Sequence, residues 1–223
     1  MDYHLGKLFQ ELETLQLLNN SLIIITSDHG ESFGEHEKWG HGELPVENQV
    51  HVPLIIHYPS VIKKPKTIAG QVQTASICST ILSSLGIPVP SCAMRGEGDI
   101  NLLKAWDGKD IRLPEYTFAE LFLPKRYMSM IRSNKYKYLM KKAFGNKEGK
   151  TVEWLFDLAN DPKELNNLIG MDIKRDDLFR EEHSKFIKEL SHTKIELNAS
   201  SPNAAKKLDQ RTREQLKALG YVR

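Results

Sequence analysis

The sequence predicts an α/β protein in which residues 1–114 form part of a doubly wound sheet, and residues 115–223 form a small antiparallel β subdomain with C-terminal helices. Three observations predict this organisation. A helical pattern leads into a short apolar strand near residue 22, a second apolar strand follows near residue 52, and short aromatic segments separated by turn residues begin after residue 114. A chain of 223 residues is long enough to build roughly one or two hydrophobic cores.

The first elements have the pattern of one α/β unit. Apolar residues recur at helical spacing over residues 5–15, which predicts a helix with one buried stripe. The run Leu22–Thr26 is continuous and β-branched, as is typical of a strand covered on both faces in a parallel sheet. A similar run spans Val52–Tyr58, and a helix is expected over Thr74–Leu85. Such a sheet has about five or six strands, so we expect this chain to be the second part of a larger α/β protein.

The second half of the chain has the pattern of an antiparallel meander. Four short aromatic-rich segments are separated by turn residues. They span Tyr116–Leu121, Tyr127–Arg132, Tyr136–Met140 and Val152–Phe156. Asp157–Asn167 has the composition of a polar turn, and charged helices are expected over Asp172–Leu190 and Ala204–Leu219.

Charge is distributed unevenly along the chain. The net charge is +2, which is too small to favour nucleic acid as a partner. Residues 1–60 carry a net charge of −7 and six of the eight histidines, whereas residues 61–223 carry +9. An acidic, histidine-rich opening favours a cation site, and we interpret the scattered lysines of the second half as a solvated face.

Several classes of protein are disfavoured by what the sequence lacks. No apolar run approaches the roughly 18 residues of a membrane span. The opening Met1–Lys7 has neither the basic region nor the apolar stretch of a secretory signal, so a cytoplasmic location is expected. Cys78 and Cys92 form no C-x-x-C pair and are expected to be buried or idle thiols rather than zinc or redox ligands.

The stretch that is most informative about chemistry follows the first predicted strand. Asp28 and His29 come directly after it, and ligands of open α/β sheets bind beyond the carboxyl ends of the strands. A carboxylate oxygen and an imidazole nitrogen suit a divalent cation, although an ordinary turn with a hydrogen-bonded histidine has the same pattern. His36 and His41 follow in a glycine-rich loop that can return imidazoles to the same place. We therefore expect Asp28, His29 and His41 to share one cation pocket.

Ordered motifs run through the first 59 residues and continue into the second half. They are Thr26-Ser27-Asp28-His29-Gly30-Glu31, then Gly34-Glu35-His36 with Trp39-Gly40-His41-Gly42, and then Val52-Pro53-Leu54-Ile55-Ile56, followed by Ser129–Tyr138, Leu155–Leu168 and Leu216–Tyr221. Together these motifs resemble the sulfatase family of the alkaline phosphatase-like superfamily. The resemblance covers essentially the whole chain.

The resemblance implies a hydrolase of small-molecule or glycan sulfate esters that works through one divalent cation, usually Ca²⁺, with Mn²⁺ as the alternative. It implies a formylglycine nucleophile made from Cys or Ser within C/S-x-P-x-R, whose hydrated form attacks sulfur. By matching position, Asp28 and His29 are implied metal ligands, and His41 is the implied catalytic residue that contacts the sulfate group or the leaving oxygen. His36 is either an outer partner of the site or a hydrogen-bonding residue of the loop.

The sequence departs from the family pattern at the nucleophile. Neither Cys78 nor Cys92 is followed by Pro and Arg at the required offsets, and no serine takes their place. The family's nucleophile and first metal-binding aspartates precede the matched region, so we expect the chain to be incomplete as an enzyme. Two alternatives stay open: a phosphonate monoester or phosphodiester hydrolase of the same superfamily, and a non-catalytic sulfatase-like module. The unpaired edge of a half-sheet also predicts self-association.

Overall fold

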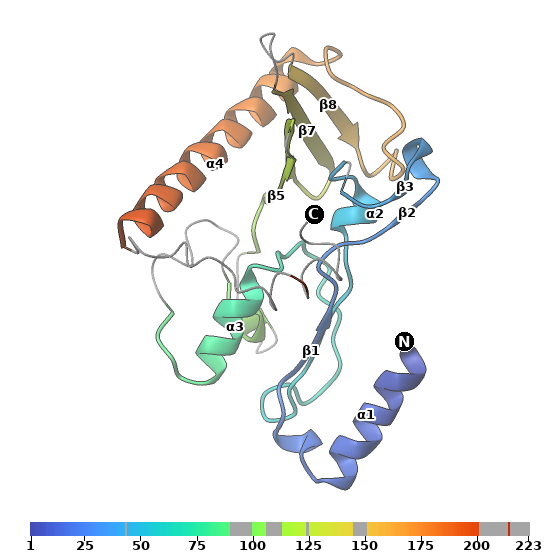
Figure 1. Ribbon diagram of the computed structural model, residues 1–223, viewed down its shortest axis with the longest axis vertical. Helices are drawn as coiled ribbons and strands as arrows, with labels where there is room; N and C mark the ends of the chain where they lie inside the picture. Colours follow the sequence, from blue (N-terminus) through green and yellow to red (C-terminus); the bar gives the residue numbers. More distant parts are fainter. Residues whose placement is uncertain are drawn as a thin grey trace.

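The described strands form three sheets, of which the β1–β4 pair and the four-stranded sheet β5–β8 lie toward opposite ends of the molecule (Figure 1). The computed structural model describes residues 1–42, 44–89, 100–105, 113–123, 125–144, 151–200 and 214. The first half contains α1 (Asp2–Thr14), β1 (Ile23–Thr26), β2 (Ser32–Phe33), β3 (Trp39–Gly40), α2 (Glu47–Val50), β4 (Leu54–His57) and α3 (Ser76–Ser84). The second half contains β5 (Thr117–Leu123), β6 (Arg126–Arg132), β7 (Tyr136–Ala143), β8 (Thr151–Asp157) and α4 (Ile173–Ser200).

Within the described residues, each helix and strand that the sequence predicts is present, whereas β2, β3 and α2 were not predicted. Apart from Glu214, which is helical, the helix expected over 204–219 lies outside the described residues, as do the family motif at 216–221 and Cys92. Cys78 lies on α3 as an exposed free thiol. Within the described ranges, no helix has the length and apolar character needed to cross a membrane.

The two apolar strands of the first half form a pair, but the predicted parallel direction is wrong. β1 and β4 run antiparallel, with Ile24 opposite Ile56. A continuous apolar run indicates that both faces of a strand are to be covered but carries no information on direction, and mixed sheets often include an antiparallel strand. The faces of this strand pair are also only partly buried by the described residues, because Ile55 is 58% exposed.

Helix α1 is present where it was predicted, but its apolar stripe is not buried by the described residues. Leu8 and Leu15 of the stripe are both more than half exposed, and α1 has no buried residue. Periodicity shows which side of a helix is apolar, but not what covers that side. The expectation of a buried stripe is therefore wrong for this part of the chain.

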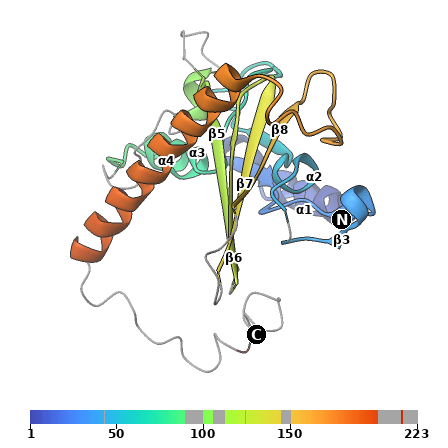
Figure 2. The ribbon, with the colours of Figure 1, turned by 90° about the horizontal axis from the view of Figure 1, so that it is seen from above.

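The second sheet, with the strand order β5-β6-β7-β8, is the predicted antiparallel meander. Helix α4 runs diagonally across one face of this sheet, and α2 with β2 and β3 lies on the other side (Figure 2). The apolar residues divide accordingly into two clusters. Ile131, Tyr138 and Leu155 pack with Phe179 of α4, whereas Met128, Met130 and Leu139 pack with Val50 of α2 and with Leu44. Because both faces are covered, this sheet forms the main core of the described chain.

A serine and a histidine join α4 to this sheet. Ser129 Oγ lies 2.7 Å from His183 Nε2, and the two residues are 0% and 6% exposed. Burial lowers the pKa of His183 below its ordinary value, which favours the neutral imidazole. The ring of Tyr138 packs edge-on against His183. We therefore interpret this contact as a structural hydrogen bond of the core rather than a nucleophile with its base.

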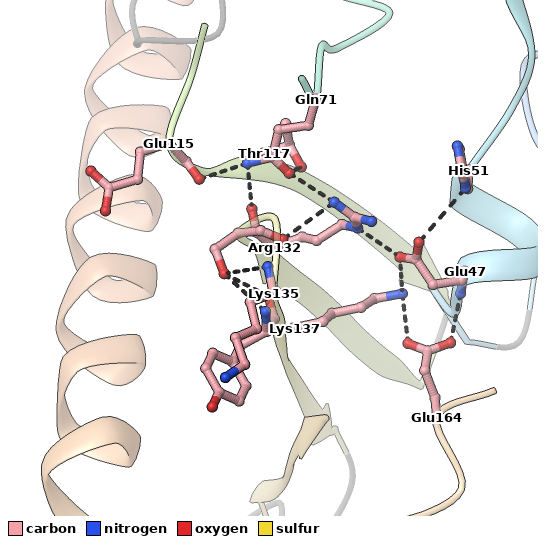
Figure 3. Close-up of polar contacts among 11 residues, drawn as sticks. Glu47, His51, Gln71, Glu115, Thr117, Arg132, Lys135, Lys137 and Glu164 are labelled. Atoms are coloured by element: carbon pink, nitrogen blue, oxygen red, sulfur yellow. Dashed lines mark hydrogen bonds and ion pairs between the residues drawn. The ribbon is translucent and has the colours of Figure 1, made fainter. Parts of the chain in front are cut away.

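A buried lysine connects the two halves of the molecule (Figure 3). Lys137 of β7 is 0% exposed, and its Nζ lies 3.2 Å from Glu47 Oε1 and 2.8 Å from Glu164 Oε1. Arg132 Nε donates to the same Glu47 oxygen at 3.0 Å, and the main-chain N–H of Glu47 donates to Glu164 Oε2 at 2.7 Å. The interpretation of the lysines as a solvated face is wrong at this position, because both faces of the sheet are covered.

Glu47 is ionised in this cluster despite its burial. Burial opposes the charged form of Glu47, but the ammonium of Lys137 and the guanidinium of Arg132 outweigh it and lower the pKa of Glu47 below its ordinary value. Two cations thus balance two carboxylates at the junction of α2 with the sheet. We call Glu47, Arg132, Lys137 and Glu164 the junction cluster.

Removing the ammonium of Lys137 should destabilise the protein strongly. Lys137→Met leaves Glu47 and Glu164 in a buried place without their shared counter-ion, which should lower the free energy of unfolding by about 3–5 kcal/mol. Adding Glu164→Gln removes one uncompensated charge and should restore part of this loss. Urea unfolding measures both effects. The control Lys142→Met, at an exposed position of the same strand, should change the free energy by less than about 0.5 kcal/mol. An equal loss in the two methionine variants would contradict the role of the cluster.

Candidate functional site

The candidate site begins where β1 ends. The main-chain N–H of His29 donates to Asp28 Oδ1 at 3.0 Å, and Ser27 Oγ donates to the His29 carbonyl at 2.6 Å. The His29 Nδ1 lies 2.8 Å from the Gly30 carbonyl, which can only accept a hydrogen bond, so Nδ1 carries the proton. In the neutral imidazole this leaves the lone pair on Nε2, and that atom lies 3.7 Å from Asp28 Oδ2. The side chains of Asp28 and His29 are 58% and 39% exposed, so solutes can reach them.

The structure brings the second predicted histidine to the same place. The imidazole rings of His29 and His41 lie with their centroids 4.1 Å apart and their planes tilted by 30°. His41 Nδ1 lies 3.2 Å from Glu31 Oε2. Glu31 belongs to the first motif, but its position in the sequence predicted no role of its own. The three predicted site residues therefore lie together, with Glu31 as an additional neighbour.

His36 lies elsewhere on the same loop. The hairpin of β2 and β3 pairs Ser32 with Gly40, and His36 occupies the turn between the strands, in η2 (Glu35–Glu37). His36 has a left-handed backbone with a φ of 54°. His29 and His41 meet beside the base of the hairpin, so the turn separates His36 from their ring contact.

Helix α2 lies behind the site and holds its loop. The main-chain N–H of Gly30 donates to the Gln49 carbonyl at 2.8 Å. Ser32 is 1% exposed, and its Oγ accepts hydrogen bonds from Asn48 Nδ2 at 3.0 Å and from Gln49 Nε2 at 2.9 Å. Ser32, Asn48 and Gln49 were not predicted from the sequence, because amides and hydroxyls that hold a loop through space have no local spacing that marks them.

Gly30 is required by the close approach of α2. A Cβ atom at this position would lie 2.0 Å from the Asn48 carbonyl oxygen. Glycine at position 30 therefore lets the site loop pass close to the main chain of α2.

The described residues alone do not complete a metal site. Within the described ranges, no group of three or more His, Cys, Asp or Glu side chains could hold a metal ion. The chemistry available at this point of the chain is thus one carboxylate and one imidazole with an open lone pair, next to a second imidazole that is held by a carboxylate.

Comparison with known proteins agrees with the fold and with the family resemblance of the sequence. A family model described as Sulfatase matches residues 1–87. An arylsulfatase of Clostridium perfringens is 28% identical over 173 residues, which cover 76% of this chain and 34% of that protein. The N-acetylglucosamine-6-O-sulfatase of Bacteroides thetaiotaomicron is 31% identical over 179 residues, which cover 76% of this chain and 30% of that protein. The chain therefore spans about a third of the length of the curated relatives it matches.

Solved structures share the arrangement of the elements. The crystal structure of yidJ from Bacteroides fragilis matches with a TM-score of 0.72 and 23% identity, covering 84% of this chain and 40% of that one. A protein crystallised in complex with its substrate D-glucosamine-2-N,6-O-disulfate matches with a TM-score of 0.64 and 24% identity, covering 93% of this chain and 40% of that one. These matches confirm the predicted class, an alkaline phosphatase-like α/β fold. Within that class, the chain is similar to the sulfatase family, whose model matches residues 1–87, and to individual sulfatases at 30–31% identity over about three quarters of its length.

Adding one methyl group at Gly30 should displace the site loop. Gly30→Ala forces the main chain away from Asn48, and we expect the free energy of unfolding to fall by about 1–3 kcal/mol. Gly6→Ala is the matched control, because a Cβ there meets nothing within 4 Å in the interior of α1, and alanine should stabilise that helix by about 0.5–1 kcal/mol. Urea unfolding of both variants checks the prediction. A loss in both, or in neither, would contradict the packing described here.

Proposed function

We propose that this chain carries part of the active site of a metal-dependent sulfatase that hydrolyses sulfate esters of small molecules or glycans. Asp28 and His29 are the proposed ligands of a divalent cation, Ca²⁺ or Mn²⁺, and His41 is the proposed residue that contacts the sulfate group or its leaving oxygen. The observation that carries the proposal is the meeting of these three side chains at the end of β1. A glycan ester is supported by the relative named N-acetylglucosamine-6-O-sulfatase and by the sugar disulfate bound in the neighbouring structure.

The donor atoms fit a cation of this kind. Two ligands that bind Ca²⁺ at about 2.3–2.6 Å and at a right angle lie roughly 3.3–3.7 Å apart, and Asp28 Oδ2 lies 3.7 Å from His29 Nε2. A metal-binding histidine commonly donates its other ring N–H to a carbonyl, as His29 does to Gly30. When bound, a divalent cation polarises the oxygens of the ester and stabilises the charge that develops on them.

The exposure of His41 and its carboxylate partner support proton transfer as its role in the proposed function. Its side chain is 54% exposed, and its Nδ1 faces the Glu31 carboxylate. A ring whose Nδ1 donates to a carboxylate is fixed in orientation and keeps Nε2 for a second partner. In the proposed reaction, Nε2 is the atom from which a proton passes to the departing alcohol oxygen.

The nucleophile is the part of the proposed machinery without a candidate in this sequence. The 223 residues contain no C/S-x-P-x-R motif, and they span about a third of the matched relatives. We propose that the nucleophile and the remaining oxygen ligands come from polypeptide outside these residues. Two ligands alone satisfy a small part of the six to eight oxygen ligands that Ca²⁺ takes, so affinity for the ion should be weak.

Titration with Mn²⁺ tests the proposed ligands. Calorimetry should detect weak binding to the chain, and Asp28→Asn should weaken it at least about tenfold because the variant removes the anionic ligand and keeps the shape of the side chain. Asp2→Asn is the control, because it removes an equal charge from the first turn of α1. Equal affinities of Asp28→Asn and the unaltered chain would remove Asp28 from the proposed ligand set.

An assay with an aryl sulfate tests the proposed incompleteness. The 223-residue chain should release the phenol no faster than its His41→Ala variant, because neither contains a recognisable nucleophile. The release is followed by absorbance with excess Mn²⁺ or Ca²⁺ present. Turnover that depends on His41 would show that the nucleophile lies within these residues, whereas a complete sulfatase containing this chain should lose activity when His41 is replaced.

A further inference from the structure

One buried amide side chain holds the site loop at two points, and its own main chain holds a third. Gln49 of α2 is 7% exposed. Its main-chain carbonyl accepts from the N–H of Gly30 at 2.8 Å. Its side chain donates from Nε2 to Ser32 Oγ at 2.9 Å and accepts at Oε1 from the N–H of Gly42 at 3.1 Å.

The three contacts of Gln49 lie next to the two histidines along the chain. Gly30 follows His29, and Gly42 follows His41, so each histidine is adjacent to a peptide group that Gln49 binds. Ser32 pairs with Gly40 at the base of the hairpin that separates the histidines in sequence. The two rings have their centroids 4.1 Å apart, and the chain segments that carry them are both hydrogen-bonded to Gln49. Their relative placement therefore depends on this one residue.

The chemistry of an amide suits this position. Gln49 offers a donor to Ser32 and an acceptor to Gly42 at the same time, and buried polar groups are costly when they are left without partners. Gly42 has a φ of 79°, a left-handed conformation in which its N–H is directed by the bond to Gln49 rather than by a regular strand.

Helix α2 is itself fixed to the β5–β8 sheet, so the position of Gln49 is fixed as well. Glu47 at the start of α2 is held by Lys137 and Arg132 of the junction cluster. Val50 at its end packs against the cluster of Met128, Met130 and Leu139. Gln49 lies between these two anchors.

We propose that Gln49 is a positioning residue, which sets the separation and mutual orientation of His29 and His41. The roles of these histidines in metal binding and ester cleavage belong to the proposed function. The catalytic significance of Gln49 rests on that proposed function. The geometric statement, that Gln49 keeps the two rings in contact, can be tested without metal or substrate.

The test compares Gln49→Met with Val50→Ala in the full 223-residue chain. Methionine fills a similar volume but loses both side-chain hydrogen bonds to the loop. Val50→Ala removes apolar contact from the next residue of α2 and leaves those bonds intact. The readout is the nuclear Overhauser effect between ring protons of His29 and His41 in the metal-free protein, with the spectrum of the second sheet as a check on folding.

We expect Gln49→Met to lose this ring contact signal while the sheet spectrum persists, and Val50→Ala to keep it. Gln49→Glu supplies a second variant, because its carboxylate can accept from Gly42 and from the Ser32 hydroxyl, and it should also keep the signal. Retention in Gln49→Met, loss in Val50→Ala, or loss in a folded Gln49→Glu would each overturn the proposal.

The affinity of the same variants for Mn²⁺ is a second, independent measurement. If Asp28 and His29 bind Mn²⁺ as proposed, Gln49→Met should weaken that binding about 10–100-fold, which is the range found when a group that orients a ligand is removed. Absence of Mn²⁺ binding in the unaltered chain would count against the proposed function alone, because the ring contact still decides the role of Gln49.

Discussion

The ion pairs of Lys137 are the interaction on which the arrangement of the molecule depends. Its ammonium is fully buried between Glu47 of the first half and Glu164 of the turn that follows β8. A buried charge is tolerated only when its partners are close and well directed, so this lysine specifies where α2 meets the sheet as well as stabilising the contact. Glu164 reaches its position through a left-handed backbone with a φ of 55°, a conformation that costs about 1–3 kcal/mol for a residue with a side chain. The ion pairs and the bond from the Glu47 N–H offset that cost.

The sequence predicted the elements of the fold well and their mutual arrangement less well. The meander of the second half was predicted because alternation and turn residues act within a few positions of one another. The antiparallel direction of β1 and β4 was missed because an apolar run has no direction. The burial of Lys137 was missed for a related reason: its carboxylate partners lie 90 residues earlier and 27 residues later in the chain, where local patterns give no sign of them.

At the site, the residues to which we assign a chemical role in the proposed function were predictable from the sequence, whereas the residues that hold them in place were not. Asp28, His29 and His41 belong to motifs that follow a recognisable strand, and the structure brings them together. The pairing of Glu31 with His41 is a contact between side chains ten residues apart, which becomes visible only when the glycine-rich loop has folded. Gln49 resembles any polar residue of a short helix in the sequence, and its burial and its bonds to Gly42 and Ser32 exist only in three dimensions.

The conformation of the site loop explains why motifs of the first 60 residues require the second half of the chain. The loop has left-handed backbone at Gly34, His36, Glu37, Gly40 and Gly42, and such conformations are unfavourable for His36 and Glu37. Local preference therefore cannot hold the loop, and α2 supplies the bonds that do so. Helix α2 has only four residues, too few to be stable alone, because the nucleus of a helix is costly and is repaid only over a longer length. Its stability must come from the junction cluster and from the packing of Val50, so the rigidity of the β5–β8 sheet passes through α2 to the two imidazole rings.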